Sequence, residues 1–362
     1  MQSNKSNKLY TPFIRTKDST SKVMSDVIIA LIPCIIMSYF AFGFIPVMVV
    51  LVAIGSAMLA EFLFSLIFFG KTDSLSDGSA IVTGILMAFT IAPFLPLHVV
   101  AFGGAMAVIF GKLLWGGLGR NMFNPALIGR EFMTIFFPVA MTSRSIWYDK
   151  TAVNLTEINL FGNEFLNGLF FKPSGAIGEY SILFLTLGGL YLLIRRRISW
   201  HIPLALLTTF TLLLFILSDY NITFSLGGLL LGTIFMATDM PSSATTRWGK
   251  LYYGAMIGLV AIVCIINGVK YEYMSYSILL LNAFTSPIDW CFRPVVWSKK
   301  LNLTNRIWQT AALTVAILIT SFAVIYIHHL EAMQYALFAY IAYCIIRFIA
   351  LDKKKTIILQ DN

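Results

Sequence analysis

The feature that most constrains this chain is a succession of long apolar stretches joined by short polar or basic connections. A helix of about 20 apolar residues crosses the hydrocarbon core of a bilayer and satisfies its own backbone hydrogen bonds there. Charged residues make up only 12% of the chain. A soluble domain carries roughly 25%, so too few charges remain to cover a surface in water. The sequence therefore predicts an all-α polytopic membrane protein.

About twelve segments are apolar enough to cross a bilayer or nearly so. They are residues 26–44, 45–69, 79–94, 97–115, 125–140, 180–194, 202–217, 224–237, 251–266, 274–287, 308–327 and 332–350. The predicted organisation follows from these segments and the polar stretches between them. It comprises an N-terminal tail (1–24), a membrane core (25–298) made of a first repeat (25–140), an external loop (141–177) and a second repeat (178–298), and a C-terminal hairpin with a tail (299–362).

Basic residues lie in short clusters between the apolar segments, and the net charge is +9. This distribution is typical of the cytoplasmic connections of a membrane protein and does not indicate nucleic-acid binding. It places the N-terminal tail in the cytoplasm and makes the lipid bilayer the main partner of the apolar surface. The four cysteines are far apart and show no metal-binding spacing, so we expect no metal site.

A weak internal repeat relates the two halves of the core. Residues 84–93 read GILMAFTIAP, and residues 232–241 read GTIFMATDMP. Five segments in each half would give the second half the opposite orientation in the membrane, as in many inverted-repeat transport proteins. The prediction is two five-helix repeats of inverted topology plus an extra C-terminal helical hairpin. The alternative is chance similarity between two apolar strings.

Both related stretches end in proline, and the second also carries an acidic residue, Asp239. A helix broken at membrane depth persists only where protein or a cavity satisfies its backbone. Glu61 lies deep in its own apolar segment and is therefore a candidate for an ion pathway. Its alternative role is a structural carboxylate that faces the helix bundle.

The stretch 236–250 reads MATDMPSSATTRWGK and is rich in hydroxyl groups. One of Ser242, Ser243, Thr245 or Thr246 suffices to cap the helix that follows. A surplus of hydroxyls beside a helix N-terminus can also hold an anion. Both interpretations are compatible with the pattern.

Residues Asp239 to Thr245 read DMPSSAT and resemble the flavinylation motif Asp-x-x-Ser-(Gly/Ser)-Ala-Thr. This motif occurs in the D subunit of Rnf-type electron transport complexes and in the homologous B subunit of Na⁺-translocating NADH:quinone oxidoreductases. The resemblance implies FMN bound covalently to Thr245 through a phosphoester. Ser243 stands where glycine is commoner, and the adjacent Thr246 leaves a register shift of one residue open.

The implied chemistry explains why these residue types occur together. A separate flavin transferase would bring FAD to the threonine hydroxyl, and AMP would leave while FMN stays attached. Small neighbours such as Ser243 give access to the hydroxyl. Ser242 could bind the resulting phosphodiester anion, and Arg247 or Lys250 could neutralise it.

Further motifs of the same family occur in the expected order along residues 12–296. They are residues 15–33, residues 77–84, the GRNMFNPA stretch at 119–126, and residues 276–294. Within GRNMFNPA, Asn121, Phe123 and Asn124 are candidates to line a flavin pocket, since amides bond the flavin edge and an aromatic ring stacks on its face. Their alternative role is to start a helix. The resemblance also implies a second, non-covalent riboflavin, whose residues the sequence does not identify.

The resemblance implies a multi-pass component of a bacterial inner-membrane complex that transfers electrons between ferredoxin and NAD⁺ and couples this to Na⁺ or H⁺ translocation. Other subunits would complete the enzyme, because this component is not catalytic alone. Two alternatives stay open: a solute channel or transporter with an inverted-repeat fold, and a flavinylated subunit of the quinone-reductase type. Counting segments places Thr245 on the cytoplasmic side, whereas attachment in this family is usually made from the outer side. The chain also continues beyond the family's usual end, with His328 and His329 at the turn of the extra hairpin.

Overall fold

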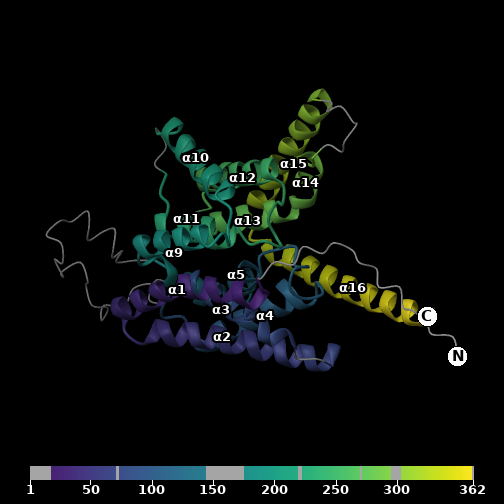
Figure 1. Cartoon of the computed structure of the whole chain (residues 1–362). Coiled ribbons are helices and arrows are strands. Elements are labelled where there is room, and N and C mark those ends of the chain that lie inside the picture. The colour runs from purple at the N-terminus through teal and green to yellow at the C-terminus, as the bar shows by residue number, and fades with distance from the viewer. Residues whose placement is uncertain are drawn as a thin grey trace.

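The computed structural model describes residues 18–70, 73–143, 175–218, 222–269, 271–294 and 303–360. All regular elements in these ranges are helical, which confirms the prediction of an all-α protein (Figure 1). Several sequence predictions lie outside the described residues. They concern most of the N-terminal tail, nearly all of the loop at 141–177, Lys71 and the pair Lys299 and Lys300.

The first half of the core runs from α1 to α6 and forms the lower part of Figure 1. Its elements are α1 (Thr20–Phe42), α2 (Ile45–Phe64) with the π-turn η1 (Ser65–Phe69), η2 (Asp73–Asp77), α3 (Ser79–Phe89), α4 (Leu97–Val108) with the π-turn η3 (Ile109–Leu113), α5 (Pro125–Phe136) and α6 (Pro138–Thr142). Gly70 and Gly78 adopt left-handed backbone angles at the turns between α2 and α3. Such angles favour glycine because it has no Cβ.

The second half forms the upper part of Figure 1 and is followed by two long helices. Its elements are η5 (Ile177–Glu179), α9 (Ile182–Ile194), α10 (His201–Ile216), α11 (Leu226–Leu231) with the π-turn η6 (Gly232–Met236), α12 (Arg247–Ile266), α13 (Tyr273–Ala283) and α14 (Thr285–Cys291). The C-terminal hairpin consists of α15 (Leu303–His329) and α16 (Met333–Gln360).

Five helical stretches among the described residues are long and apolar enough to cross a membrane. They are Thr20–Phe42, Ile45–Phe68, Arg247–Ile266, Leu303–His329 and Met333–Leu351. The remaining apolar segments form shorter helices, so the expectation of about twelve comparable crossings is too simple. The broken ends are where the sequence indicates them: α3 ends at Phe89, and η6 ends at Met236.

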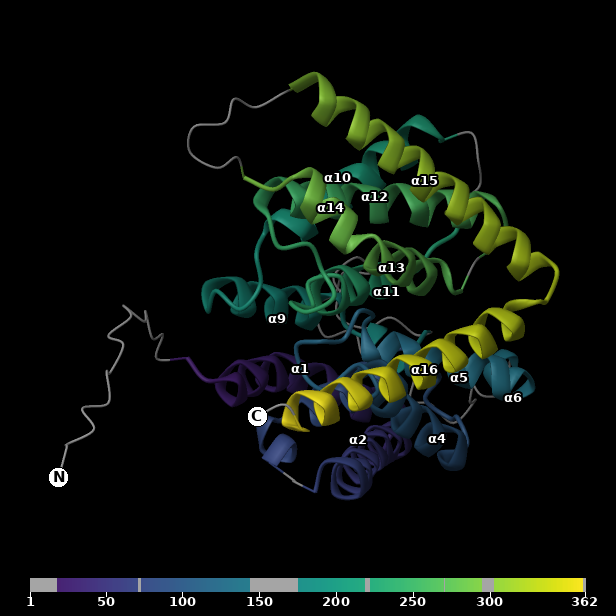
Figure 2. The same ribbon diagram turned by 90° about the vertical axis from the view of Figure 1, so that its right-hand side faces the viewer.

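Two predicted segments are each divided into a pair of helices. The segment 125–140 breaks at Phe137, because Pro138 starts α6 and disfavours the helical conformation at the residue before it. The segment 274–287 ends near Phe284, and α14 follows at a new angle (Figure 2). The helix in the segment 125–140 is therefore shorter than predicted, because Pro138 ends it. The helix in the segment 274–287 is also shorter than predicted.

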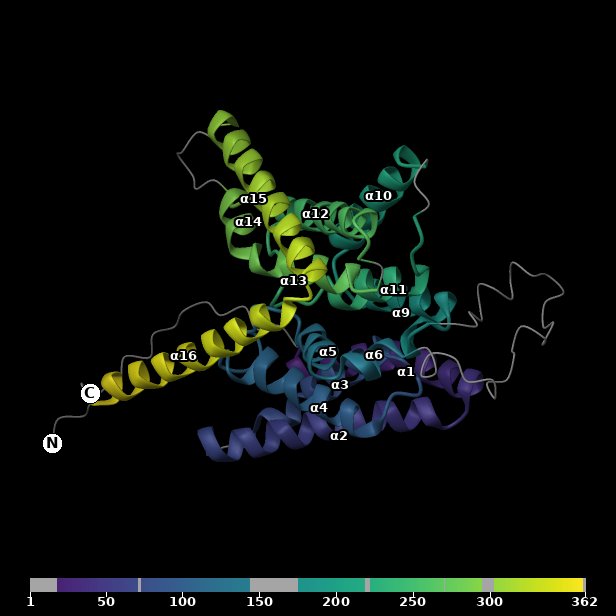
Figure 3. The same cartoon turned by 180° about the vertical axis from the view of Figure 1, so that it is seen from behind.

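The C-terminal hairpin contacts both halves of the core. Helix α15 packs on α12, α13 and α14, whereas α16 packs on α5 in the first half (Figures 2 and 3). The indole N–H of Trp115 donates to the Tyr340 hydroxyl at 3.1 Å, and that hydroxyl donates to the carbonyl of Phe110 at 2.9 Å. The hairpin thus joins the two halves across their boundary.

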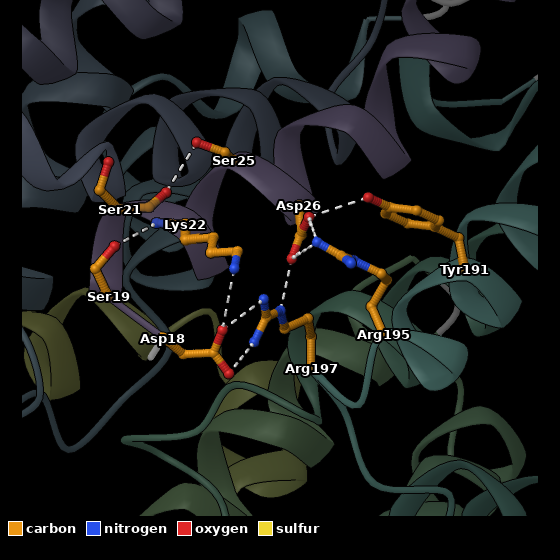
Figure 4. A network of polar contacts seen from close by, with 9 residues as sticks. All are labelled: Asp18, Ser19, Ser21, Lys22, Ser25, Asp26, Tyr191, Arg195 and Arg197. Atoms are coloured by element: carbon orange, nitrogen blue, oxygen red, sulfur yellow. Dashed lines mark hydrogen bonds and ion pairs between the residues drawn. The ribbon is translucent and has the colours of Figure 1, made fainter. Parts of the chain in front are cut away.

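A buried ionic network joins α1 to the turn between α9 and α10 (Figure 4). The Asp26 carboxylate accepts from Arg197 at 2.6 Å, from Tyr191 at 3.0 Å and from Arg195 at 3.2 Å. Arg197 also pairs with Asp18 at 3.0 Å, and its hydrogen bond holds the pKa of Asp18 below its usual value. The start of α1 and the arginine-rich turn therefore lie at the same end of the bundle, as the distribution of charge predicts.

Candidate functional site

The loop that carries the flavinylation-like motif connects η6 to α12. The Asp239 carboxylate accepts from the Ser242 hydroxyl at 2.7 Å, and the Ser243 N–H donates to the Asp239 carbonyl at 3.0 Å. Burial raises the pKa of Asp239, and the bonds from Ser242 and Asn121 act in the opposite direction. Asp239 therefore stabilises the conformation of this loop through hydrogen bonds with Ser242 and Ser243.

The GRNMFNPA loop lies against the motif loop. The Asn121 amide donates to Asp239 at 3.3 Å. The Asn124 amide donates to the carbonyl of Met236 at 3.2 Å, while its oxygen accepts from the N–H of Ala126 at 3.0 Å. Asn124 thus caps α5 and also holds the end of η6, so the capping role and the link to the site coexist.

Asn282 of α13 is a buried residue that links the two loops. The sequence alone indicated no role for it. In the amide orientation that satisfies both of its ends, Asn282 donates to the Ser242 carbonyl at 3.1 Å and accepts from the Asn124 N–H at 3.0 Å. Its side chain also meets the Tyr253 hydroxyl at 2.6 Å. A fully buried amide persists where its partners are all provided, so Asn282 fixes the distance between the loops.

The two adjacent threonines have different surroundings. The Thr246 hydroxyl accepts from the N–H of Gly249 at 3.1 Å and is the N-cap of α12. Thr245 is exposed, and its hydroxyl donates to the Asp289 carboxylate at 2.8 Å. The geometry therefore makes Thr245 the accessible hydroxyl and commits Thr246 to capping.

Asp289 of α14 faces the start of α12 with both carboxylate oxygens. It accepts from the N–H of Thr245 at 2.9 Å and 3.0 Å and from the N–H of Thr246 at 3.1 Å. The sequence offered one signal for this residue, its acidic side chain beside an apolar segment. It gave no indication of the partner, because the pairing of α14 with the start of α12 depends on the fold.

Other predicted site residues lie at some remove from this contact. Phe123 packs against Trp115 and Tyr340, with ring centroids 6.0 Å and 5.6 Å away, so its aromatic contacts include the hairpin. Arg247 is exposed and Lys250 half-buried in the first turn of α12. Both lie within five residues of Thr245 in the sequence.

Glu61 forms a separate buried ion pair within the first half. Its carboxylate accepts from the Lys112 ammonium at 2.7 Å, and Lys112 also bonds the Ser79 hydroxyl and approaches Asp77 at 3.9 Å. Both members of the pair are almost fully buried. This is the arrangement expected for the structural alternative, although a buried pair is also compatible with an ion pathway.

The direction of α12 fixes which end of the bundle carries Thr245. Gly254 of α12 faces Ile202 of α10, and Gly258 faces Leu206, so the two helices run in parallel. Helix α10 begins at His201, shortly after the turn that contains Arg195 and Arg197. Thr245 therefore lies at the end of the bundle where α10 begins.

The histidine pair of the hairpin turn is engaged in two separate contacts. The Nδ1 atom of His328 lies 3.0 Å from the Tyr276 hydroxyl, and Nε2 of His329 lies 2.7 Å from the Asn267 carbonyl. In the described part of the chain, no three histidine, cysteine or acidic side chains gather as a metal site would require.

This architecture, with long apolar helices and a hydroxyl-bearing loop between η6 and α12, defines the chain as a polytopic helical membrane protein with a candidate functional site at that loop. A family profile described as NQR2, RnfD, RnfE matches residues 8–298. The chain belongs to this family.

The relatives share about a third of their residues with this chain. The D subunit of the proton-translocating ferredoxin:NAD(+) oxidoreductase complex of Clostridium ljungdahlii is 33% identical over 79% of this chain and 94% of its own length. The D subunit of the Na(+)-translocating ferredoxin:NAD(+) oxidoreductase complex of Acetobacterium woodii is 34% identical over 77% of this chain and 91% of its own length. The D subunit of the ion-translocating oxidoreductase complex of Aliivibrio salmonicida is 32% identical over 80% of this chain and 97% of its own length.

Proposed function

We propose that this chain is the D subunit, a membrane component, of an Rnf-type ion-translocating ferredoxin:NAD⁺ oxidoreductase and carries FMN on Thr245. The observation that carries the flavin assignment is the exposed Thr245 hydroxyl beside the N-terminus of α12. Bound flavin supplies the one- and two-electron chemistry, and the protein positions it. The other subunits of the complex are its partners, together with a flavin transferase during maturation and the bilayer of the bacterial inner membrane.

The residues present fit a phosphoester-linked flavin. Thr245 and the first two residues of α12 are exposed, with Trp248 at 68%, whereas residues 242–244 just before Thr245 are buried. The backbone N–H groups of Thr245 and Thr246 donate to the same oxygen of the Asp289 carboxylate. A phosphodiester carries the same negative charge, and a helix N-terminus favours it. Arg247 and Lys250 add positive charge in the same turn.

The polar groups behind the motif would keep the loop in one conformation. Asp239, Asn121 and Asn282 link this loop to the GRNMFNPA loop. A covalently attached flavin transfers electrons over a defined distance only if its anchor is rigid. In this proposal Asp239, Ser242, Asn121 and Asn124 support the anchor, and Thr245 makes the bond.

The proposed fold of the core is two inverted repeats, supported by matching helix contacts in the two halves. Gly104 of α4 packs against the backbone of Ala53 in α2, and Gly254 of α12 packs against the backbone of Ile202 in α10. The short α3 contacts both helices of the first pair, and η6, which continues α11, contacts α10 of the second pair. The two glycines also lie at nearly the same offset in the sequence repeat, 20 residues after Gly84 and 22 residues after Gly232.

Electron transfer in the assembled complex tests the proposed function. Membranes that contain the wild-type chain should reduce NAD⁺ with reduced ferredoxin, and Thr245→Ala should abolish both this activity and the covalent flavin fluorescence of the chain. Thr209→Ala, a hydroxyl deletion on α10, should leave both intact. A Thr245→Ala complex with full activity would overturn the proposal.

A further inference from the structure

We infer that Asp289 accepts the proton of the Thr245 hydroxyl when FMN is attached, and that it orients this hydroxyl for attack. The inference rests on the proposed function, since it concerns how the flavin would be acquired. It assigns to this chain, as the acceptor of the modification, a part of the chemistry that would otherwise belong wholly to the transferase.

The geometry around the hydroxyl leaves little freedom of orientation. The Thr245 hydroxyl donates to one Asp289 oxygen at 2.8 Å, within the range required of a general base. The carboxylate is itself held by the N–H groups of Thr245 and Thr246. The hydroxyl proton is thus directed at Asp289, while Thr245 itself is exposed.

A purely structural role for Asp289 explains less of this arrangement. The Thr246 hydroxyl already caps α12 by accepting from the N–H of Gly249. Asp289 contacts the hydroxyl of Thr245 as well as backbone N–H groups, and the Thr246 hydroxyl lies farther from it, at 3.4 Å. The carboxylate therefore bonds the Thr245 hydroxyl more closely than the Thr246 hydroxyl. Capping of α12 would not require this preference.

The step balances without a further reactant beyond FAD. The Oγ1–H bond of Thr245 breaks as Oγ1 bonds the phosphorus atom of the FMN half of FAD. The P–O bond of the pyrophosphate breaks, and AMP leaves with the bridging oxygen and its electron pair. Asp289 takes the proton and passes it to solvent. No atom is oxidised or reduced.

Attachment of FMN to Thr245 removes the hydrogen bond between the Thr245 hydroxyl and Asp289. The modified Oγ1 has no proton to donate, and the phosphodiester places a second negative charge beside the carboxylate. Like charges at this distance repel, so the N–H groups of Thr245 and Thr246 become available to the phosphate. Asp289 thus holds the anion site until the flavin phosphate occupies it.

Transfer kinetics with the purified full-length chain test the inference. The chain is incubated with purified flavin transferase and FAD, and covalent FMN is followed by in-gel fluorescence at several chain concentrations. Asp289→Asn keeps an acceptor oxygen but not a base, so turnover should fall about 10²–10⁴-fold while the half-saturating chain concentration stays unchanged. Asp289→Glu should recover part of the turnover.

The control is Glu272→Gln, the same carboxylate-to-amide change at the residue before α13. This variant should acquire covalent FMN with the turnover of the wild type. Wild-type turnover in Asp289→Asn, or a rise in half-saturating concentration alone, would overturn the inference. If Asp289→Asn does not give a monodisperse protein, Asp289→Ser decides. Its hydroxyl can accept from the backbone N–H groups but is not a base, so wild-type turnover in this variant would also overturn the inference. Failure of the wild-type chain and Glu272→Gln to acquire any flavin would contradict the proposed function instead.

Discussion

At the scale of residues, one fold-dependent contact distinguishes two neighbouring hydroxyls. Thr245 and Thr246 are equivalent by type and adjacent in sequence, so the motif leaves a shift of one residue open. Thr246 caps α12, and Thr245 is exposed and bonded to Asp289. The residue types of the site could be predicted from the sequence. Asp289 and Asn282 could not, because their partners lie on other helices.

We expect Thr246→Ala to keep FMN on Thr245 while lowering stability. Loss of an N-cap destabilises a helix by about 1 kcal/mol. The thermal midpoint of the detergent-purified chain should fall by a few degrees, with covalent flavin fluorescence retained. Thr246→Ser is the matched control, since serine also caps. Loss of fluorescence in Thr246→Ala alone would shift the attachment site to Thr246.

The buried pair of Glu61 and Lys112 gives a second residue-scale prediction. Lys112→Met removes the cation and leaves the Glu61 carboxylate buried without it. Breaking a buried pair in this way destabilises a protein by about 3–5 kcal/mol. Thermal unfolding should show this loss, and the double change Lys112→Met with Glu61→Gln should restore much of it. Equal stabilities of the single and double variants would contradict this account of the pair.

At the scale of elements, the sequence predicts where helices break better than it predicts how long they are. The ends of α3 and η6 follow from the polar and proline residues after them. The division of α5 from α6 depends on Pro138, and that of α13 from α14 lies three residues before Pro287, in the first turn of α14. The pairing of helices depends on close backbone contacts, which periodicity alone does not reveal.

Gly254 tests one of these contacts. A Cβ atom at this position would lie 2.5 Å from the Ile202 carbonyl oxygen, so Gly254→Ala should push α10 away from α12. Overpacking of this kind costs about 1–3 kcal/mol, and the thermal midpoint should fall. Gly55 is the matched control, because nothing lies within 4 Å of its added Cβ. Equal behaviour of the two alanine variants would exclude the close contact.

At the scale of the whole molecule, the C-terminal hairpin adds a connection beyond the core that the family profile matches. The match ends at residue 298, and α15 and α16 begin later. Ile317 and Cys344 are nearly fully buried against the core, and Tyr340 bonds Trp115. The sequence predicted the hairpin as two membrane segments. Its contact with both halves required the three-dimensional arrangement.

Removal of residues 303–362 should therefore weaken the core without removing its flavin. The cut exposes Trp115 and Phe123, so the thermal midpoint should fall by several degrees, whereas Thr245 and Asp289 keep their contact. Truncation after Leu351 keeps the contacts of Ile317, Tyr340 and Cys344 and serves as the control. Equal midpoints for the two truncations would contradict the role of the hairpin as a connector.

The central claim is that the chain holds FMN on Thr245, and peptide mass mapping tests it most directly. The chain is purified from a host that contains the flavin transferase and digested, and the peptide that spans Arg247 and the residues before it is fragmented. We predict the mass of FMN, less one water, on Thr245. A peptide that is unmodified, or that carries the adduct on Thr246, would contradict the claim.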